Sequence, residues 1–451
     1  MLLDHPAPPI PCPFISSLPV EILSDIFIVG QSIDGVDRDN ECDSDCVEFE
    51  QSPAPPFEVR LTQVCSQWRL VAINTGQLWS RISVGPGYSP AAVRVYLERS
   101  RECLLDVCLQ SCPSASTTNQ VLDAVFQQSV RWRACTLEGD MDSLIMSKIV
   151  ALPVPTLRVF RCTVQPPMRT RRLDEVWENR LVFESGKGCP ALKAVILHSF
   201  AVHFALPPLT NVTKLQLDYL GRLPLKYDRF RELLTNCRSL VHLSIRGEIT
   251  DSSLPWPSKV DNSSAVVVPR LSTLRISSLS SNVYSGILLS IDAPLLRSLI
   301  LEGAQEMDLD RFLRLGTPCR FTRLRSLALY RSSLTPSKLS EVYTLFPLLD
   351  EIIAEGFMFD PTEVITRVTE TITDLGLDPL PFLKHKHPST TLGVMLNQGQ
   401  RVYLEQTLEQ DLLDEQLDVD YDSGWTFHKF FGWLLTFITV EALVRAKEAA
   451  K

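Results

Sequence analysis

The sequence predicts an α/β repeat protein: a helical module near the N-terminus, followed by an irregular solenoid with parallel strands inside and helices outside. A short apolar pattern that recurs along most of the chain predicts the strands, and helical spacing of apolar residues between its copies predicts the outer helices. Apolar residues make up 45% of the chain and charged residues 22%, which is typical of folded proteins.

Length and net charge limit the domain organisation and the classes of ligand that are expected. The 451 residues exceed what one compact core accommodates, so several units or an extended array are expected. The formal net charge is -9, and no basic stripe is visible along the linear sequence. Binding to nucleic acid through the release of counterions is therefore not expected.

The cysteines and the apolar runs indicate in which cellular compartment the protein is expected and whether a membrane segment is expected. The 12 cysteines are scattered over a chain whose residues 1–13 lack the positive start and apolar run of a secretory leader. Reduced thiols and a cytoplasmic or nuclear location are therefore expected. The longest apolar run, residues 430–440, is shorter than the ~20 residues that a membrane-spanning helix needs, so no membrane segment is predicted.

Residues 14–84 are predicted to form the helical module. Pro19 suits the first position of a helix, where its missing N–H is no loss. The first helix carries a wide apolar stripe at four-residue spacing, made by Leu18, Ile22 and Ile26 with Leu23 beside them. An acidic insert, residues 30–57, ends in several prolines and is predicted to be a flexible loop.

A second helical pattern follows the insert. Its apolar residues are Leu61, Val64, Cys65, Trp68 and Ala72. A unit of this size scarcely builds a full core, so apolar surface is expected to remain exposed for a partner.

The order and spacing of these residues resemble the F-box family, in the form common among fungal F-box-like proteins. The matching residues are Leu18-Pro19-Val20-Glu21-Ile22-Leu23, Ile26-Phe27, Val64-Cys65-Ser66-Gln67-Trp68 and Leu78-Trp79. The resemblance implies a three-helix module that docks on the Skp-type adaptor of a cullin-RING ubiquitin ligase. It assigns the adaptor contacts to Leu18, Pro19, Ile22, Leu23, Ile26, Val64, Cys65 and Trp68.

The long insert is a departure from a minimal F-box. Loops of this kind cost little in entropy, about 0.6 kcal/mol per doubling of length, so the module is expected to fold with it. The alternative is a degenerate F-box that only caps the array.

Residues 100–381 repeat an apolar residue followed three and five positions later by another, with offsets between copies of about 20 to 35 residues, mostly within the leucine-rich repeat range. The copies are Leu157-Phe160-Cys162, Leu192-Val195-Leu197, Val212-Leu215-Leu217, Leu240-Leu243-Ile245, Leu271-Leu274-Ile276, Leu296-Leu299-Leu301, Leu324-Leu327-Leu329 and Leu349-Ile352-Ala354, with weaker ones at Leu104-Val107-Leu109 and Trp132-Cys135-Leu137. Stacked strands of this kind close one continuous core.

Residues between the core positions of each strand alternate with them and are expected on the concave side. They are Lys193 and Ala194, Lys214 and Gln216, His242 and Ser244, Thr273 and Arg275, Ser298 and Ile300, and Ser326 and Ala328. Residues 228–234 have helical spacing and are expected on the outer side. Residues 382–451 are predicted to form an acidic and aromatic helical tail or cap.

Catalytic and metal sites find little support. No glycine-rich phosphate loop occurs, and the spacings of Cys42 with Cys46, and of Cys103, Cys108 and Cys112, do not suit zinc. No cofactor and no enzyme activity are expected.

The resemblance implies a substrate-recognition subunit of a Skp-cullin-F-box ubiquitin ligase that binds a protein client through the array. The alternative is a non-catalytic repeat scaffold whose F-box no longer binds the adaptor.

Overall fold

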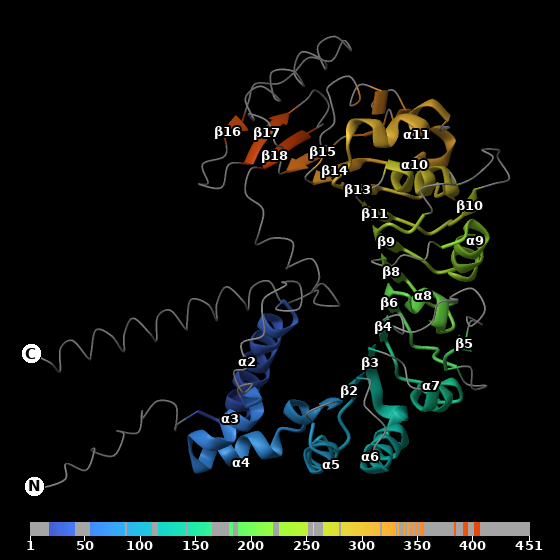
Figure 1. The fold of residues 1–451 in the computed structure, drawn as a ribbon. Coiled ribbons are helices and arrows are strands. Elements are labelled where there is room, and N and C mark those ends of the chain that lie inside the picture. The colour runs from blue at the N-terminus through green and yellow to red at the C-terminus, as the bar shows by residue number, and fades with distance from the viewer. Residues whose placement is uncertain are drawn as a thin grey trace, which may run out of the picture.

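The structure is a computed structural model. It describes residues 18–40, 55–85, 88–110, 116–139, 143–164, 180–183, 188–219, 225–250, 265–278, 281–315 and 318–330, together with Trp256 and shorter stretches between 332 and 405. A large, mostly parallel sheet curves through the molecule, with strands on the inner side of the arc and helices on the outer side (Figure 1). The predicted α/β solenoid-like arrangement is confirmed.

The N-terminal helices come first. They are α2 (Val20–Asn40), α3 (Phe57–Val64), α4 (Ser66–Asn74) and the 3-10 turn η2 (Gly76–Trp79). The expectation of a loop from residue 30 is wrong for residues 30–40, which continue α2. Gln31 explains the extension, because this buried side chain donates hydrogen bonds to Glu58 and to the Leu78 carbonyl, each at 2.9 Å. Residues 41–54 lie outside the described residues.

The main sheet contains fourteen strands among the described residues, in the order β1-β2-β3-β4-β6-β8-β9-β11-β13-β14-β15-β18-β17-β16. Their bounds are β1 Arg81–Val84, β2 Leu105–Gln110, β3 Trp132–Glu138, β4 Val159–Val164, β6 Ala194–Ser199, β8 Lys214–Tyr219, β9 His242–Gly247, β11 Thr273–Ser277, β13 Ser298–Glu302, β14 Ser326–Tyr330, β15 Glu351–Glu355, β16 Leu383–Lys384, β17 Thr391–Met395 and β18 Arg401–Glu405. Two small two-stranded sheets accompany it, β5 (Arg180–Leu181) with β7 (Ala205–Leu206) and β10 (Val266–Val267) with β12 (Ile291–Asp292).

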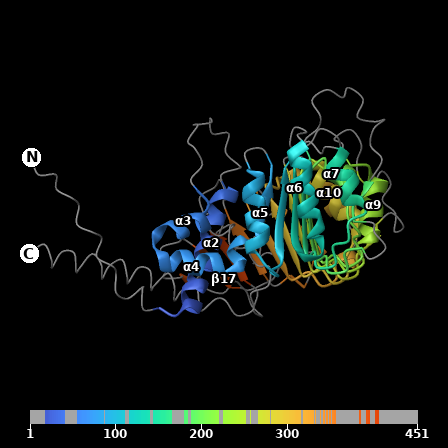
Figure 2. The same cartoon turned by 90° about the horizontal axis from the view of Figure 1, so that it is seen from below.

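The outer layer consists of short helices between the strands. They are α5 Pro90–Arg99, α6 Ser116–Gln127, α7 Ser143–Val150, α8 Ala201–Phe204, α9 Tyr227–Asn236, α10 Ser281–Ser290 and α11 Asp310–Leu315, with 3-10 turns η3 Ser129–Arg131, η5 Glu306–Leu309 and η6 Pro318–Phe321. The helix expected at residues 228–234 is confirmed as α9. Figures 1 and 2 agree that α2–α4 lie on the strand side of the array, opposite α7, α9 and α10.

The repeat pattern forms the core. From Leu157 to Leu329, every core residue of the predicted copies is at most 2% exposed, and these side chains belong to one continuous cluster. Equivalent positions pair strand by strand, as where Leu243 of β9 meets Leu274 of β11. The regular register follows from burial, because a shift by one residue would turn each apolar side chain to the solvent.

The first units differ from the prediction. Leu104 is 36% exposed, and Leu105 takes its place in the core, where the pairing of β2 with β3 contains a register shift. The array also starts earlier than residue 100. Its first strand, β1, lies within residues 14–84, the range predicted for the helical module, and pairs with β2. A bulge moves a neighbouring leucine inward without disturbing Val107 and Leu109, both buried.

At the other end, residues assigned to a helical tail or cap contribute strands instead. β18 pairs in parallel with β15, and β17 and β16 follow in antiparallel orientation. Alternation of polar and apolar residues in Arg401-Val402-Tyr403-Leu404-Glu405 suits a strand. Residues 406–451, which hold the rest of the predicted tail, lie outside the described residues.

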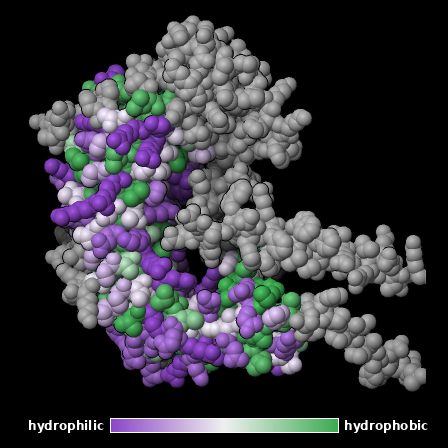
Figure 3. All heavy atoms as spheres, turned by 180° about the vertical axis from the view of Figure 1, so that it is seen from behind, coloured by the Kyte–Doolittle hydropathy of each residue, from purple (hydrophilic) through white to green (hydrophobic). Residues whose placement is uncertain are grey.

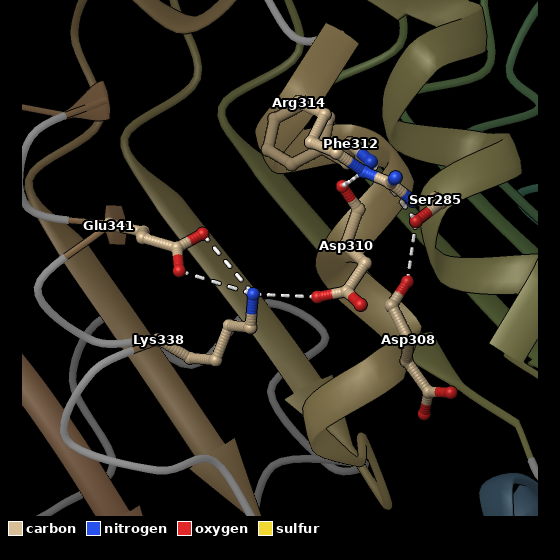
Figure 4. Close-up of polar contacts among 7 residues, drawn as sticks. All are labelled: Ser285, Asp308, Asp310, Phe312, Arg314, Lys338 and Glu341. Atoms are coloured by element: carbon tan, nitrogen blue, oxygen red, sulfur yellow. Dashed lines mark hydrogen bonds and ion pairs between the residues drawn. The ribbon is translucent and has the colours of Figure 1, made fainter.

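Polar contacts join neighbouring units of the outer layer. The Ser285 hydroxyl of α10 donates to the Asp308 carbonyl and accepts from the Phe312 amide (Figure 4). The Lys338 ammonium forms an ion pair with Asp310 of α11, 2.7 Å away, and contacts Glu341 as well. These contacts connect α10 to α11, and α11 to residue 338, on the outside of the sheet.

Candidate partner-binding surfaces

The N-terminal helices have a small core of their own. Its buried residues are Leu23, Phe27, Leu61, Val71, Ala72, Leu78 and Trp79. The Trp79 indole N–H donates to the Ala72 carbonyl at 2.8 Å, so this large side chain is buried with its polar atom satisfied. Phe27 and Trp68 meet with ring centroids 5.0 Å apart. We call residues 18–79 with this core the helical module.

A buried carboxylate joins the helical module to the array. Glu58 of α3 is 6% exposed and accepts hydrogen bonds from Gln31 of α2 and from the hydroxyl of Tyr96 in α5. The Tyr96 ring also meets Trp79 edge-on, and the Arg99 guanidinium lies 4.4 Å from the Trp79 ring centroid. Tyr96 therefore packs against both cores.

Large apolar side chains remain exposed on the helical module. Val20 and Ile22 of α2 are 54% and 47% exposed, and Val64 at the end of α3 and Leu70 of α4 are 59% and 64% exposed. In Figure 3, hydrophobic residues gather over the N-terminal helices. We call Val20, Ile22, Val64 and Leu70 the exposed apolar set. Exposed apolar surface on an otherwise closed module is typical of a partner-binding site.

Several residues assigned to adaptor contact are accessible. Pro19, Ile22, Val64 and Cys65 are exposed, and Leu18 is half-buried. Cys65 also has a structural role, because it precedes α4 and its sulfur accepts a hydrogen bond from the Trp68 amide.

The assignment of Leu23 to the contact surface is wrong for this conformation, because Leu23 is 1% exposed in the core of the helical module. Ile26 and Trp68 are half-buried and pack against that core. Sequence reasoning missed Val20 and Leu70 as exposed residues. The signal for Val20 was present, since it lies between Leu18 and Ile22 but off their four-residue spacing. For Leu70, the spacing of apolar residues does not distinguish an exposed position from a core position.

The concave strand face is the second surface. Of the residues expected there, Gln216, Ser244, Thr273 and Ser298 are half-buried, as side chains on an open sheet face are. Ala194 and Ala328 are buried, at 7% and 3%, so they are not available to a client. Lys193 is exposed and immediately precedes β6.

Ion pairs cross this face near the carboxyl ends of the strands. His198 of β6 lies 3.2 Å from Asp218 of β8, and Arg275 of β11 lies 3.1 Å from Glu302 of β13. Burial alone would raise the pKa of Asp218, but the hydrogen bond with His198 and the charges of His198 and Arg246 lower it overall. These pairs are not recognisable along the chain, because their partners are about one repeat apart.

The histidine at the amino end of β9 has a different environment. Burial, followed by the positive charge of Lys214, lowers the pKa of His242 below its usual value. Lys214 and His242 pair in register on β8 and β9. The neutral imidazole is therefore favoured there.

Within the described residues, no group of three or more His, Cys, Asp or Glu side chains is placed to hold a metal ion. Cys103 and Cys108 are half-buried, and Cys42, Cys46 and Cys112 lie outside the described residues. Each helix in the described part of the chain is too short or too polar to cross a membrane. No protein-family model matches the chain, and no curated protein matches its sequence.

Proposed function

We propose that this protein is the substrate-recognition subunit of a Skp-cullin-F-box type ubiquitin ligase. In this proposal the helical module binds the Skp-type adaptor, and the array holds a protein client. The exposed apolar set carries the proposal, because a small module with a filled core still exposes Ile22 and Val64 at positions where an F-box contacts its adaptor.

Adaptor binding would bury these side chains. Fully burying one Val or Ile side chain contributes about 1.5–3 kcal/mol, so a few of them suffice for a specific interface. Leu23 and Phe27 hold α2 in place under these exposed residues, because both side chains are buried in the core that α2 shares with α3 and α4. The contact residues retained in the proposal are Leu18, Pro19, Ile22, Val64 and Cys65, with the exposed edges of Ile26 and Trp68.

The protein would contribute no reacting group. A receptor that binds both ligase and client raises the effective concentration of the client lysines near the transferring enzyme. A curved array that carries the helical module on its strand side suits this role, because the client and the ligase then face a common space (Figures 1 and 2).

The test is co-purification of the full-length chain with a Skp-type adaptor. The double variant I22D/V64D is expected to reduce adaptor recovery by more than about tenfold, because each change places a charge in an apolar interface. The matched control is V267D/L315D, since Val267 and Leu315 are similarly exposed, at 61% and 48%, but lie on the array. Equal recovery from a folded I22D/V64D variant and the control would overturn the proposal.

A second function has one observation in its favour. The contacts of Tyr96 with Glu58 and Trp79 seal the first unit of the array, which is what a capping module does in a repeat protein. A non-catalytic repeat scaffold with such a cap predicts that no adaptor is recovered even with the unchanged chain.

A further inference from the structure

Residues at the amino ends of the strands form a continuous file. From Arg158 onward, each backbone N–H in this file donates to the carbonyl of the equivalent residue one unit earlier, at 2.7–2.9 Å. The file runs through Arg133, Arg158, Lys193, Thr213, Val241, Ser272, Arg297 and Arg325. The side chains at these positions therefore follow one another from strand to strand, with the ~4.8 Å spacing of paired strands.

Most residues of this file are basic. Arg133, Arg158, Lys193, Arg297 and Arg325 belong to it, and Arg238, Arg270 and Arg323 lie within three residues before a member of the file. All of them are exposed. We call these residues the basic edge. The edge extends from β3 to β14.

Acidic residues are missing from the turns that lead into these strands. Neither Asp nor Glu occurs in residues 151–158, 189–193, 207–213, 235–241, 267–272, 293–297 or 316–325. Arg133 is paired with Asp106 at 2.6 Å. Among the described residues, no ion pair engages Arg158, Lys193 or Arg297.

Acidic residues gather at the opposite ends of the strands instead. Glu138, Asp218 and Glu302 are at or near the last positions of β3, β8 and β13. The carboxyl ends thus carry acidic groups together with Arg246 and Arg275, whereas the turns before the strands carry basic groups and no acidic ones. The chain as a whole is acidic, at -9, so the basic edge is a local feature and not a consequence of composition.

We propose that the basic edge binds an acidic, carboxylate-rich segment of the client protein, lying extended along the array from strand to strand. This inference rests on the proposed function and deepens it by naming the chemistry of the client. Guanidinium groups bind carboxylates through two parallel hydrogen bonds, and Arg158 near one end of the edge and Arg297 near the other present this group on the same side of the sheet. A single extended segment fits one edge, whereas a nucleic-acid duplex is wide enough to bring phosphates towards Glu138, Asp218 and Glu302.

The test measures binding of the full-length chain to a fluorescent peptide of alternating glutamate and glycine. The variant R158Q/K193Q/R297Q is expected to weaken binding about tenfold or more, since exposed ion pairs contribute modestly but add along the edge. R94Q/K226Q/R231Q removes the same charge from exposed residues of α5, of α9 and of the position just before α9, and is expected to change affinity less than about twofold. A glutamine peptide of equal length is expected not to bind.

Each outcome has one meaning. Equal loss in the two triple variants, or binding of the glutamine peptide, would overturn the inference. Preference for a single-stranded oligonucleotide over the acidic peptide would also overturn it and would indicate a nucleic-acid surface. Adaptor recovery separates this inference from the proposed function: R158Q/K193Q/R297Q is expected to retain the adaptor, and I22D/V64D is expected to retain the peptide.

Discussion

The Tyr96 hydroxyl donates a hydrogen bond to the Glu58 carboxylate, and this contact joins the first outer helix of the array to the helical module. Gln31 donates to the other carboxylate oxygen, so α2, α3 and α5 meet at one buried group. A buried carboxylate is stable only when it is hydrogen-bonded, and Glu58 therefore fixes how the three helices meet.

Removal of the Tyr96 hydroxyl is predicted to loosen this joint. Burial, and then Glu58, raise the pKa of Tyr96, so the hydroxyl stays protonated and acts as a donor at neutral pH. Tyr96→Phe leaves one Glu58 oxygen unsatisfied and is expected to lower the free energy of unfolding by about 1–3 kcal/mol in urea titrations. Tyr88→Phe is the control, because Tyr88 is 51% exposed. Equal effects of the two changes would contradict this account of Glu58.

Two neighbouring residues of α2 are predicted to have different roles: Leu23 in stability and Ile22 in adaptor binding. Leu23→Ala opens a cavity in the core of the helical module and is expected to cost about 2–5 kcal/mol of stability. Ile22→Ala is expected to change stability by less than about 0.5 kcal/mol, since Ile22 is 47% exposed, while it weakens adaptor recovery. Chemical denaturation followed by tryptophan fluorescence measures both. A larger stability loss for Ile22→Ala than for Leu23→Ala would reverse the assignment of the two residues.

The array was predictable because its period is local. An apolar residue at the first, fourth and sixth position of a unit requires a strand with one buried face, and a lone strand cannot bury it. Leu243 and Leu274 were therefore assigned to the core without knowledge of their pairing, and both are at most 1% exposed. The edges of the pattern were less predictable, since nothing local decides that Leu105 and not Leu104 points inward.

The surfaces were less predictable than the core. The wide apolar stripe of α2 has one side that faces α3 and α4 and one that faces solvent, and spacing alone does not separate Leu23 from Ile22. The basic edge was invisible along the chain, because Arg158 and Lys193 are far apart in sequence and become neighbours only when the units stack. Gln31 was assigned to a loop because its stabilising partner, Glu58, lies beyond the acidic insert.

The titration of His242 is predicted to respond to its neighbour on the next strand. Burial and Lys214 hold its pKa below the usual 6.5, so the folded protein binds fewer protons there than the unfolded chain. The stability contributed by neutral His242 is thus present above the unfolded pKa and is lost as the pH falls through the folded value. Lys214→Met is expected to raise the pKa of His242, measured by NMR of the imidazole protons. Lys226→Met, at the residue that precedes α9, is the control. An unchanged His242 titration in Lys214→Met would exclude Lys214 as a cause.

Gly303 and Gly188 both have a positive φ, but only Gly303 has close neighbours. Comparing the two positions therefore distinguishes the cost of backbone strain from the cost of steric crowding. Gly303 follows β13 with a φ of 79°, and an added Cβ would lie 3.3 Å from the Ser278 carbonyl oxygen and 3.6 Å from the Tyr284 hydroxyl. The oxygen of that hydroxyl accepts from the Ser278 amide, and its single proton is shared between the Ser278 and Glu302 carbonyls, so the loop cannot move aside without breaking these bonds. Gly188 has a φ of 53° and open space around its Cβ position.

Gly188→Ala is therefore predicted to lower the free energy of unfolding by the backbone contribution alone, about 1–2 kcal/mol. Gly303→Ala carries the same contribution and in addition crowds the Ser278 carbonyl, which accepts a hydrogen bond from the Tyr284 hydroxyl, so the loss is expected to reach about 2–4 kcal/mol. Urea titration of the two variants side by side gives the difference. If the losses were equal, the contacts around Tyr284 would have to be soft enough to accept a methyl group, and the junction between β11 and β13 would owe its geometry to the backbone of the two strands rather than to this side chain.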